Sequence, residues 1–285
     1  MHGIVVLDKP AGESSSRALA QLRAVAKVGH AGTLDPFATG VLLALVGDAT
    51  RLSSLAMRLK KTYHATVRFG WRTDTLDTEG QVVEECNPGV PRDMADALAG
   101  LTGEILQTPP AHSAKKIDGR RAYKLARAGK TPAMEPRKVV VHALTECGGA
   151  WPEVELEVVC GAGTYVRSLA RDLGAAIGLP ASLIALRRTA IGPYRVEDAD
   201  KSRCRPALEL IEAAGLACVN LDKADALRFV TGRPLETALE QRCGLVFSGR
   251  LLGVGKPDGT ECVFASARRE IETGQLPMAR GEETD

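Results

Sequence analysis

The sequence has little of what marks disulfide-rich, zinc-binding and membrane-spanning proteins. Its seven cysteines include no CxxC pair, and its five histidines show no HxxxH or HExxH spacing, which argues against a disulfide framework and a zinc site. No apolar run approaches the roughly 20 residues that a membrane helix needs. The apolar start at residues 3–7 is too short for a signal-peptide core. We therefore expect a protein of the reducing cytoplasm with no membrane partner and no metal.

Aromatic side chains and net charge are also scarce. Aromatic residues make up 4% of the 285 residues and the formal net charge is +2, so the field of the whole molecule says little about its partners. The apolar content of 45% and the charged content of 25% are those of an ordinary globular protein. A chain of this length can bury a sizeable core, and one large domain plus a small one is the natural expectation.

The positive charge that is present is concentrated in one segment. Between Lys115 and Lys138 the chain carries nine lysines and arginines but only two carboxylates. Arg120, Lys124 and Arg127 follow helical spacing, so they can share one face of a helix. Such an imbalance favours binding to phosphates, although a run of charge is also typical of a solvated face.

One segment, KVGHAGTLDPFATGVLL, crowds three glycines and a proline around a single carboxylate, Asp35. Pro36 restricts the residue before it to an extended conformation, and the apolar run from Val41 to Val46 is typical of a buried strand. The pattern predicts that Asp35 lies on a rigid, narrow loop anchored by a core strand. A turn with a capping aspartate is the simpler interpretation of the same residues.

The part GHAGTLDPFATGVL resembles the catalytic motif of the TruB family of tRNA pseudouridine synthases, in which the Asp of the LDP segment is the catalytic carboxylate. Ala31 stands where a threonine is more usual in the family. The resemblance continues in order through LDKPAGESS, KTY, RTDTLDTEG, GTYVR and LIALRR. It covers about residues 3–195 and implies that Asp35 is the catalytic residue.

The resemblance also implies a set of residues around the target nucleotide. Tyr63 would stack on the base, Arg167 would pair with Asp35, and Leu186 would pack against the base. Core packing or a surface ion pair is the ordinary interpretation of each of these side chains alone. The residues expected to bind the nucleotide or to support its pocket are Tyr63, Tyr165, Arg167, Leu186, His30 and Lys9.

The basic segment resembles an insertion that grips the T loop of tRNA in this family. The match runs from Ser113 through Arg127, inside a segment expected at residues 109–138. His112 stands where a tyrosine is usual, so no phenol contact is expected there. The residues expected to contact the RNA backbone are Lys115, Lys116, Arg120, Lys124 and Arg127.

The fold implied is the α+β pseudouridine synthase fold, a central mixed, mainly antiparallel sheet with flanking helices, over residues 1–220. Ser14 to Ser16 can cap a helix whose apolar face carries Leu19, Leu22 and Val25. From residue 221 to 285 short strands alternate with Gly, Asp and Pro. This part resembles a small β-rich PUA-like RNA-binding domain, with a disordered tail from Gly281.

The function implied is the isomerisation of uridine 55 in the T loop of tRNA to pseudouridine. The enzyme would act as a monomer without cofactor or guide RNA. The target base must be flipped out of its stack. Asp35 can then attack C1′ or C6 as a nucleophile, or act as a base on the ribose. Two alternatives stay open, a guide-dependent synthase and an RNA-binding module or tRNA chaperone without catalysis.

Overall fold

A nine-stranded sheet forms the body of the protein. The computed structural model describes residues 2–91, 93–112, 116–117, 120–121, 134–257 and 259–268, with residues 116–117 and 120–121 described by their backbone only. The main path of the sheet runs β1-β3-β12-β4-β11-β10-β7, with β2 beside β3 and β13 beside β12. The strands are β1 (Gly3–Lys9), β2 (Val28–His30), β3 (Thr39–Val46), β4 (Lys61–Phe69), β7 (Gly103–Gln107), β10 (Arg137–Ala150), β11 (Glu153–Cys160), β12 (Ala181–Ile191) and β13 (Tyr194–Arg195).

The pairing confirms the predicted mixed, mainly antiparallel sheet. Every neighbouring pair is antiparallel except β3 with β12, which run parallel. In β4 buried and more exposed residues alternate along the whole strand, as a sheet with one covered face requires. By contrast β3 is buried at every position after Thr39, because apolar residues pack on both of its faces.

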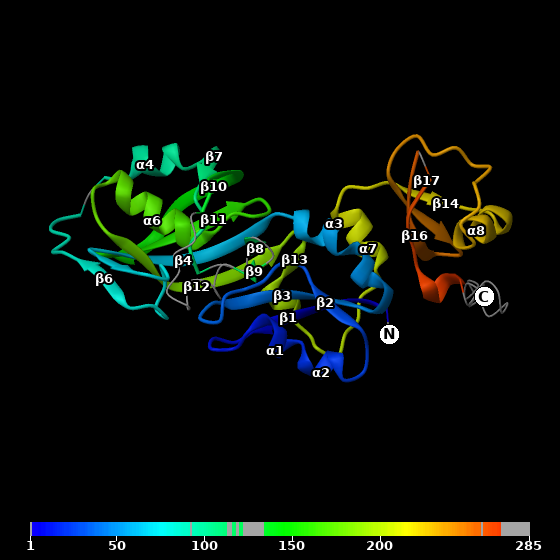
Figure 1. The fold of residues 1–285 in the computed structure, drawn as a ribbon, viewed down its shortest axis with the longest axis horizontal. Coiled ribbons are helices and arrows are strands. Elements are labelled where there is room, and N and C mark those ends of the chain that lie inside the picture. The colour runs from blue at the N-terminus through cyan, green and yellow to red at the C-terminus, as the bar shows by residue number, and fades with distance from the viewer. Residues whose placement is uncertain are drawn as a thin grey trace, which may run out of the picture.

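Short helices cover the sheet. α4 (Ala95–Gly100) and α6 (Val166–Ala176) lie along its upper side in Figure 1, and α1 (Ser15–Ala18) and α2 (Ala20–Arg23) lie on its lower side. α3 (Ser53–Arg58) precedes β4. The buried face of α6 packs in one core cluster with β4, β11 and β12. A hairpin of β5 (Trp71–Thr73) and β6 (Val82–Glu85) extends from the end of β4.

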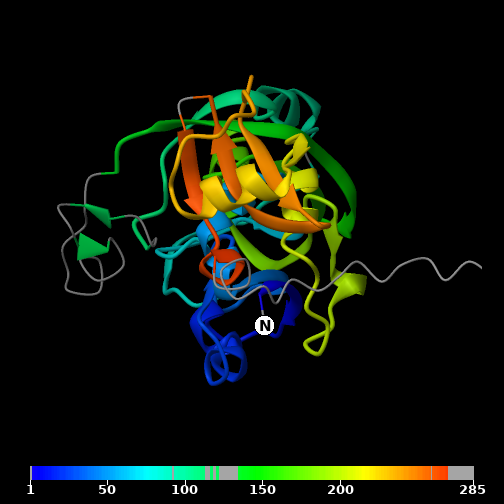
Figure 2. The same ribbon diagram turned by 90° about the vertical axis from the view of Figure 1, so that its right-hand side faces the viewer.

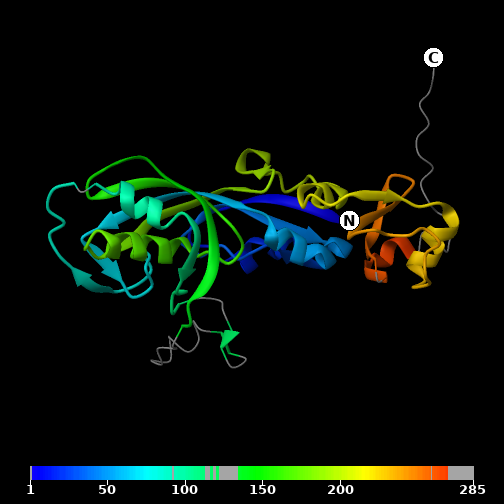
Figure 3. The same cartoon turned by 90° about the horizontal axis from the view of Figure 1, so that it is seen from above.

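The carboxy-terminal part forms a separate four-stranded sheet at one end of the elongated molecule (Figures 1 and 3). Its elements are β14 (Cys218–Asn220), α8 (Lys223–Val230), β15 (Cys243–Phe247), β16 (Arg250–Lys256) and β17 (Gly259–Val263), preceded by α7 (Leu208–Ala213). The sheet therefore begins just before the boundary predicted at residue 221. One core cluster joins Leu245 and Leu252 of this part to Ile4 and Leu43 of the main sheet, so the two sheets are packed together.

The helical face predicted for the basic segment is wrong at Arg120. The segment contains two-residue strands, β8 (Lys116–Ile117) and β9 (Arg120–Arg121), which pair with each other. Arg120 therefore lies in an antiparallel strand pair rather than on a helical face. Figures 2 and 3 show the pair projecting from the body. Lys115, Lys124 and Arg127 lie outside the described residues.

The predicted amino-terminal helix is shorter than expected. Ser14 caps it as predicted, accepting from the backbone N–H of Arg17, and Leu19 is fully buried. The helix is interrupted at Leu19 and ends at Arg23, because the chain then turns back to pair as β2 with β3. Val25 is therefore 76% exposed rather than part of the buried face.

A Gly40→Ala variant should lose stability because the two parallel strands touch at this residue. Gly40 pairs with Arg188 of β12, has φ +103, and an added Cβ would overlap the Arg188 carbonyl oxygen. We expect the free energy of unfolding to fall by at least about 2 kcal/mol. Gly12→Ala is the matched control, since Gly12 has φ +75 but open space around it, and should cost only about 1 kcal/mol. Equal losses in urea titrations would contradict this account of Gly40.

Candidate active site

Four segments that are far apart in the sequence form most of the lining of a cavity of about 340 Å³, to which Met57 of α3 and Arg137 of β10 also contribute. The four segments are the loop between β2 and β3, the start of β4, the turn before α6, and the middle of β12. The side chains that give the cavity its chemical character are Asp35, Lys61, Tyr63, Tyr165, Arg167 and Arg188. Leu34 and Ala38 anchor the first of these loops in the core beneath α6, so the loop that carries Asp35 is held at both ends.

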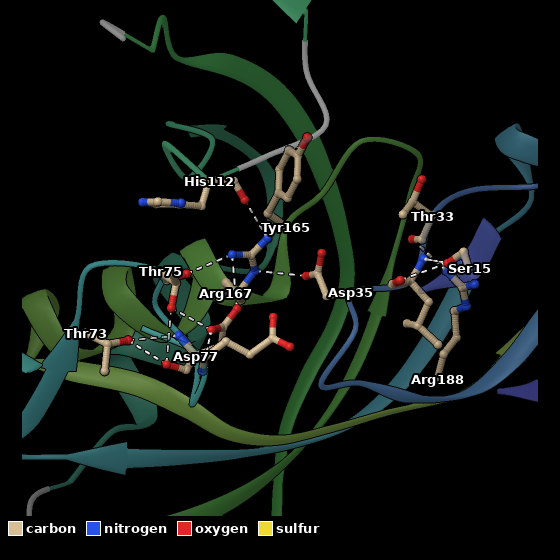
Figure 4. Close-up of polar contacts among 12 residues, drawn as sticks. Ser15, Thr33, Asp35, Thr73, Thr75, Asp77, His112, Tyr165, Arg167 and Arg188 are labelled. Atoms are coloured by element: carbon tan, nitrogen blue, oxygen red, sulfur yellow. Dashed lines mark hydrogen bonds and ion pairs between the residues drawn. The ribbon is translucent and has the colours of Figure 1, made fainter. Parts of the chain in front are cut away.

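Asp35 and Arg167, which both line the cavity, point toward each other (Figure 4). Oδ2 of Asp35 lies 2.9 Å from Nε of Arg167, although the N–H is not aligned for a hydrogen bond, so the contact is an ion pair. The Arg167 side chain is 5% exposed and that of Asp35 is 32% exposed. A buried cation therefore orients a carboxylate that a ligand can still reach.

A second carboxylate, Asp77, holds the other side of the same guanidinium. Oδ2 of Asp77 lies 3.2 Å from Nη1 of Arg167, and its side chain is 3% exposed. Nη1 and Nη2 also donate to the backbone oxygens of Thr75 and His112, at 2.8 and 3.0 Å. Thr75 donates its hydroxyl to Oδ1 of Asp77. With its donors bound in these four directions, the guanidinium has a fixed position relative to Asp35.

Two buried side chains fix the loop around Asp35 from behind. The hydroxyl of Ser15 donates to the Leu34 carbonyl oxygen at 2.8 Å and accepts from the Leu34 N–H at 2.9 Å. The ammonium group of Lys9 donates to the Pro36 carbonyl oxygen at 3.1 Å. Both side chains bind the backbone of a residue adjacent to Asp35, so they position the carboxylate without touching it.

A Lys9→Met variant should loosen this loop. Nζ of Lys9 also donates to the carbonyl oxygens of Pro10 and Glu13, and burial lowers the pKa of this ammonium group. Methionine fills the space but leaves three acceptors without their donor, which should cost about 1–3 kcal/mol of unfolding free energy. Turnover should fall with it, while the exposed control Lys27→Met should change neither. Wild-type stability and turnover in Lys9→Met would remove Lys9 from the support of the loop.

Tyr63, Leu186 and Arg188 line the side of the cavity formed by β4 and β12. The Tyr63 ring is 8% exposed, and burial raises the pKa of its phenol. The Arg188 guanidinium carbon lies 6.0 Å from the centre of this ring, within reach of a cation–π interaction. Nε of Arg188 donates to the Val41 carbonyl oxygen at 2.7 Å. Aromatic and aliphatic surfaces thus flank a space bordered by positive charge.

Gln107 of β7 binds the backbone of Tyr165, the residue directly before the start of α6, through two hydrogen bonds that form a clamp. Its amide nitrogen donates to the Tyr165 carbonyl oxygen at 3.1 Å, and its amide oxygen accepts from the Tyr165 N–H at 2.8 Å. The Arg137 guanidinium carbon lies 5.1 Å from the centre of the Tyr165 ring. The clamp fixes the residue from which α6 starts, two positions before Arg167.

The structure brings together most of the nucleotide-binding residues expected from the sequence. Tyr63, Tyr165, Arg167 and Leu186 line the cavity with Asp35. Lys9 supports the Asp35 loop and is not among the lining residues that the structure describes. His30 lies in β2 opposite Ala44, and it too is outside the cavity lining in the described part of the chain. Side chains at Lys116 and Arg120 fall outside the description, as do the other three expected RNA-backbone residues.

Sequence reasoning missed five residues of the site. The missed residues are Ser15, Lys61, Asp77, Gln107 and Arg188. Three of them, Asp77, Lys61 and Arg188, lie in segments that the family resemblance covers. An ionisable side chain inside such a segment was the signal that could have pointed to each of them. Gln107 carried no comparable signal, because its partner is a backbone group 58 positions away.

The part of the chain that the structure describes contains no group of three or more His, Cys, Asp or Glu side chains suited to holding a metal ion. Within the same residues, no helix is both long and apolar enough to pass through a lipid bilayer.

Comparisons with known proteins match this chain to one family. A family model described as TruB family pseudouridylate synthase (N terminal domain) matches residues 19–166. The tRNA pseudouridine synthase B of Thermobifida fusca (strain YX) is 49% identical over 211 residues, covering 69% of this chain and 72% of the relative. The protein of the same name from Burkholderia pseudomallei (strain 668) is 42% identical over 256 residues, covering 83% of each chain.

Solved structures share the fold at low sequence identity. A chain from a structure named as a Cbf5-Nop10-Gar1 complex has a TM-score of 0.66 and 23% identity, covering 95% of this chain and 80% of that chain. A chain from an H/ACA RNP bound to a substrate RNA containing 2′-deoxyuridine also has a TM-score of 0.66, with 21% identity, covering 92% of this chain and 85% of that chain. Both comparisons span the two sheets of the present chain.

Proposed function

This chain belongs to the TruB family of pseudouridylate synthases, and we propose that it converts uridine 55 in the T loop of tRNA to pseudouridine without a guide RNA. The observation that carries the proposal is the reachable Asp35 carboxylate, ion-paired to buried Arg167, in a cavity also lined by Tyr63 and Leu186. Relatives named tRNA pseudouridine synthase B support tRNA as the substrate.

The cavity fits a flipped pyrimidine nucleotide. Extruding the base from its stack costs a few kcal/mol, and stacking on an aromatic ring recovers roughly 1–3 kcal/mol. Tyr63 is the aromatic side chain placed for that stacking, with Leu186 lining the same cavity. Tyr165 directly precedes α6 and lines the same cavity, where it can contact the ribose or the base.

Asp35 performs the chemistry in this proposal. The reaction breaks the bond between C1′ and N1, turns the base, and joins C1′ to C5. Asp35 can act by attack on C1′, by attack on C6, or by removing a proton from the ribose. The Arg167 ion pair holds Asp35 in place for each of these routes. No redox step or group donor is needed, because substrate and product are isomers.

The remaining parts would bind the rest of the RNA. The segment at residues 109–138, with its excess of cations, would grip the T arm. The carboxy-terminal sheet with α8 would act as a PUA-like domain that contacts a second site on full-length tRNA. The protein would work as a monomer in the cytoplasm, with His30 as a support of the Asp35 loop.

The experiment is pseudouridine mapping at nucleotide resolution on two unmodified RNAs, full-length tRNA and an isolated T-arm hairpin. Purified protein should modify both with EDTA present and no other RNA added. A variant that ends at residue 217, before β14, should lose affinity for tRNA more than turnover of the hairpin. Activity that required an added guide RNA would replace the proposal with the guide-dependent alternative, and binding without product would replace it with a non-catalytic RNA-binding role.

A further inference from the structure

Lys61 is a buried cation inside the cavity that the mechanism above does not use. It is the first residue of β4, it is 6% exposed, and it lines the cavity with Tyr63 and Asp35. Its ammonium group donates to the carbonyl oxygen of Leu59 at 2.6 Å and to that of Met57. An ammonium group has three donors, so one N–H has no acceptor among the described residues.

The balance of charge around Lys61 is positive. Arg167 holds both nearby carboxylates, Asp35 and Asp77. Lys61 and Arg188 have no carboxylate within ion-pair distance among the residues that the structure describes, and both are almost fully buried. Buried charges are normally paired, since leaving water without a partner is costly. Burial, and then the charge of Arg188, lower the pKa of Lys61 to about 8. The positive charge of Lys61 and Arg188 is therefore not balanced by these residues, and a bound ligand can supply the negative partner.

We propose that the free N–H of Lys61 donates to a carbonyl oxygen of the flipped uracil and stabilises the negative charge that develops there. This inference rests on the proposed function and adds a residue to the same site. The base is preferred over a phosphate as the partner because Lys61 is so deeply buried. Phosphates stay joined to the neighbouring nucleotides at the cavity mouth, whereas the base enters between Tyr63 and Leu186.

Each route open to Asp35 places negative charge on the uracil oxygens. When C1′–N1 breaks, its electron pair stays with the ring and spreads over O2 and O4, while C1′ is captured by Asp35 or loses the C2′ proton to it. When Asp35 instead adds to C6, the C5–C6 π electrons move toward O4. The pair on the ring later forms the bond from C5 to C1′, while the Asp35–C1′ bond breaks or the C2′ proton returns to the sugar; an adduct at C6 releases Asp35 as well. The C5 proton then leaves to a base and N1 takes up a proton, so that product and free enzyme result. Lys61 stabilises the charge between these two steps.

The test combines a protein variant with altered bases. Lys61→Met keeps most of the unbranched side chain but removes its donors and its charge. We expect kcat on the T-arm hairpin to fall about 10²–10³-fold with little change in the hairpin Kd. The exposed neighbour Lys60 provides the control, since Lys60→Met should keep wild-type kcat. Hairpins with 2-thiouridine or 4-thiouridine at the target test the contact itself, because sulfur is the weaker hydrogen-bond acceptor.

One of the two thio bases should slow the wild-type enzyme, and that same base should slow Lys61→Met much less. Equal slowing of both proteins, or a Lys61→Met variant with wild-type kcat, would overturn the proposal. In either case the proposed function would stand, because it rests on product formation by the wild-type protein. A purely structural role for Lys61 would lower activity on oxygen and sulfur substrates by the same factor.

A measurement on the wild-type protein covers the case in which Lys61→Met does not fold. Among the described residues, the titratable or charged groups that act on Lys61 are Arg188 of β12 and Cys160 of β11, and Tyr63 lies on the same buried face of β4. Burial raises the pKa of Tyr63 and that of Cys160, to about 11, so both stay neutral near pH 8. The charged form of Lys61 is lost as pH rises through about 8. Hence kcat/KM, which reports the free enzyme, should fall there, and a flat profile from about pH 7 to pH 9 would overturn the proposal.

Discussion

An Asp35→Asn variant should form no detectable pseudouridine on a T-arm hairpin, although it should still bind that RNA. The amide keeps the shape of the side chain beside Arg167 but removes its charge, its nucleophilicity and its basicity. We expect the single-turnover rate to fall by at least about 10³-fold, as for the loss of other essential nucleophiles. The measurement pairs a hairpin binding titration with quantitative pseudouridine mapping.

A matched control separates this effect from the general loss of a carboxylate. Asp8 also forms an ion pair with an arginine, Oδ2 lying 2.7 Å from Nη2 of Arg187, but its side chain is 41% exposed. Asp8→Asn should therefore keep near wild-type turnover. Measurable turnover by Asp35→Asn would move the chemistry to another group, and loss of hairpin binding would leave Asp35 with a structural role instead.

Replacement of Arg167 by Met should reduce both stability and activity. Arg167 is the counter-ion of Asp77, whose side chain is 3% exposed. Removing one partner of a buried ion pair leaves an uncompensated charge, which should lower the free energy of unfolding by about 3–5 kcal/mol. Turnover should fall as well, because Asp35 loses the cation that orients it. Urea titration and the hairpin assay measure the two effects separately.

The double variant Arg167→Met with Asp77→Asn distinguishes the two roles of the arginine. Asparagine removes the buried charge but can still accept from Thr75 and the Glu79 N–H, which contact Oδ1 of Asp77. Stability should therefore recover toward that of the wild type, while turnover should stay low. If turnover recovered together with stability, Arg167 would be a structural residue rather than a support of Asp35.

The sequence predicted the parts of the fold that depend on local pattern. The apolar run at residues 41–46 and the alternation along β4 required no knowledge of distant residues, and both strands form as predicted. The amino-terminal helix was overextended to Val25, because its end is set by the pairing of β2 with β3. Local periodicity contains no information about where a neighbouring strand needs the chain to turn.

The same division applies to the site. Asp35, Tyr63, Tyr165, Arg167 and Leu186 were found because each belongs to a short motif with a recognisable order. The paired carboxylates of Arg167 were not foreseen as a unit, since Asp77 comes from the hairpin after β5 and Arg167 from α6. Lys61 was overlooked because its neighbour Tyr63 explained the motif by itself, and only the folded chain reveals a buried ammonium group with a donor to spare.

The loop around Asp35 is held from three directions, by Ser15, Lys9 and Arg188, and these side chains donate to the main-chain oxygens of Leu34, of Pro36, and of Gly32 and Thr33 rather than to the carboxylate. Such a loop has little conformational entropy left to lose when RNA arrives. The protein is thus preorganised for binding. The free-energy cost of the conformational change on binding is therefore borne mainly by the RNA, which must unstack and rotate a nucleotide. Discrimination between RNAs should then follow how readily each one deforms, and an RNA with a loosened loop should bind faster than a rigid one of the same sequence.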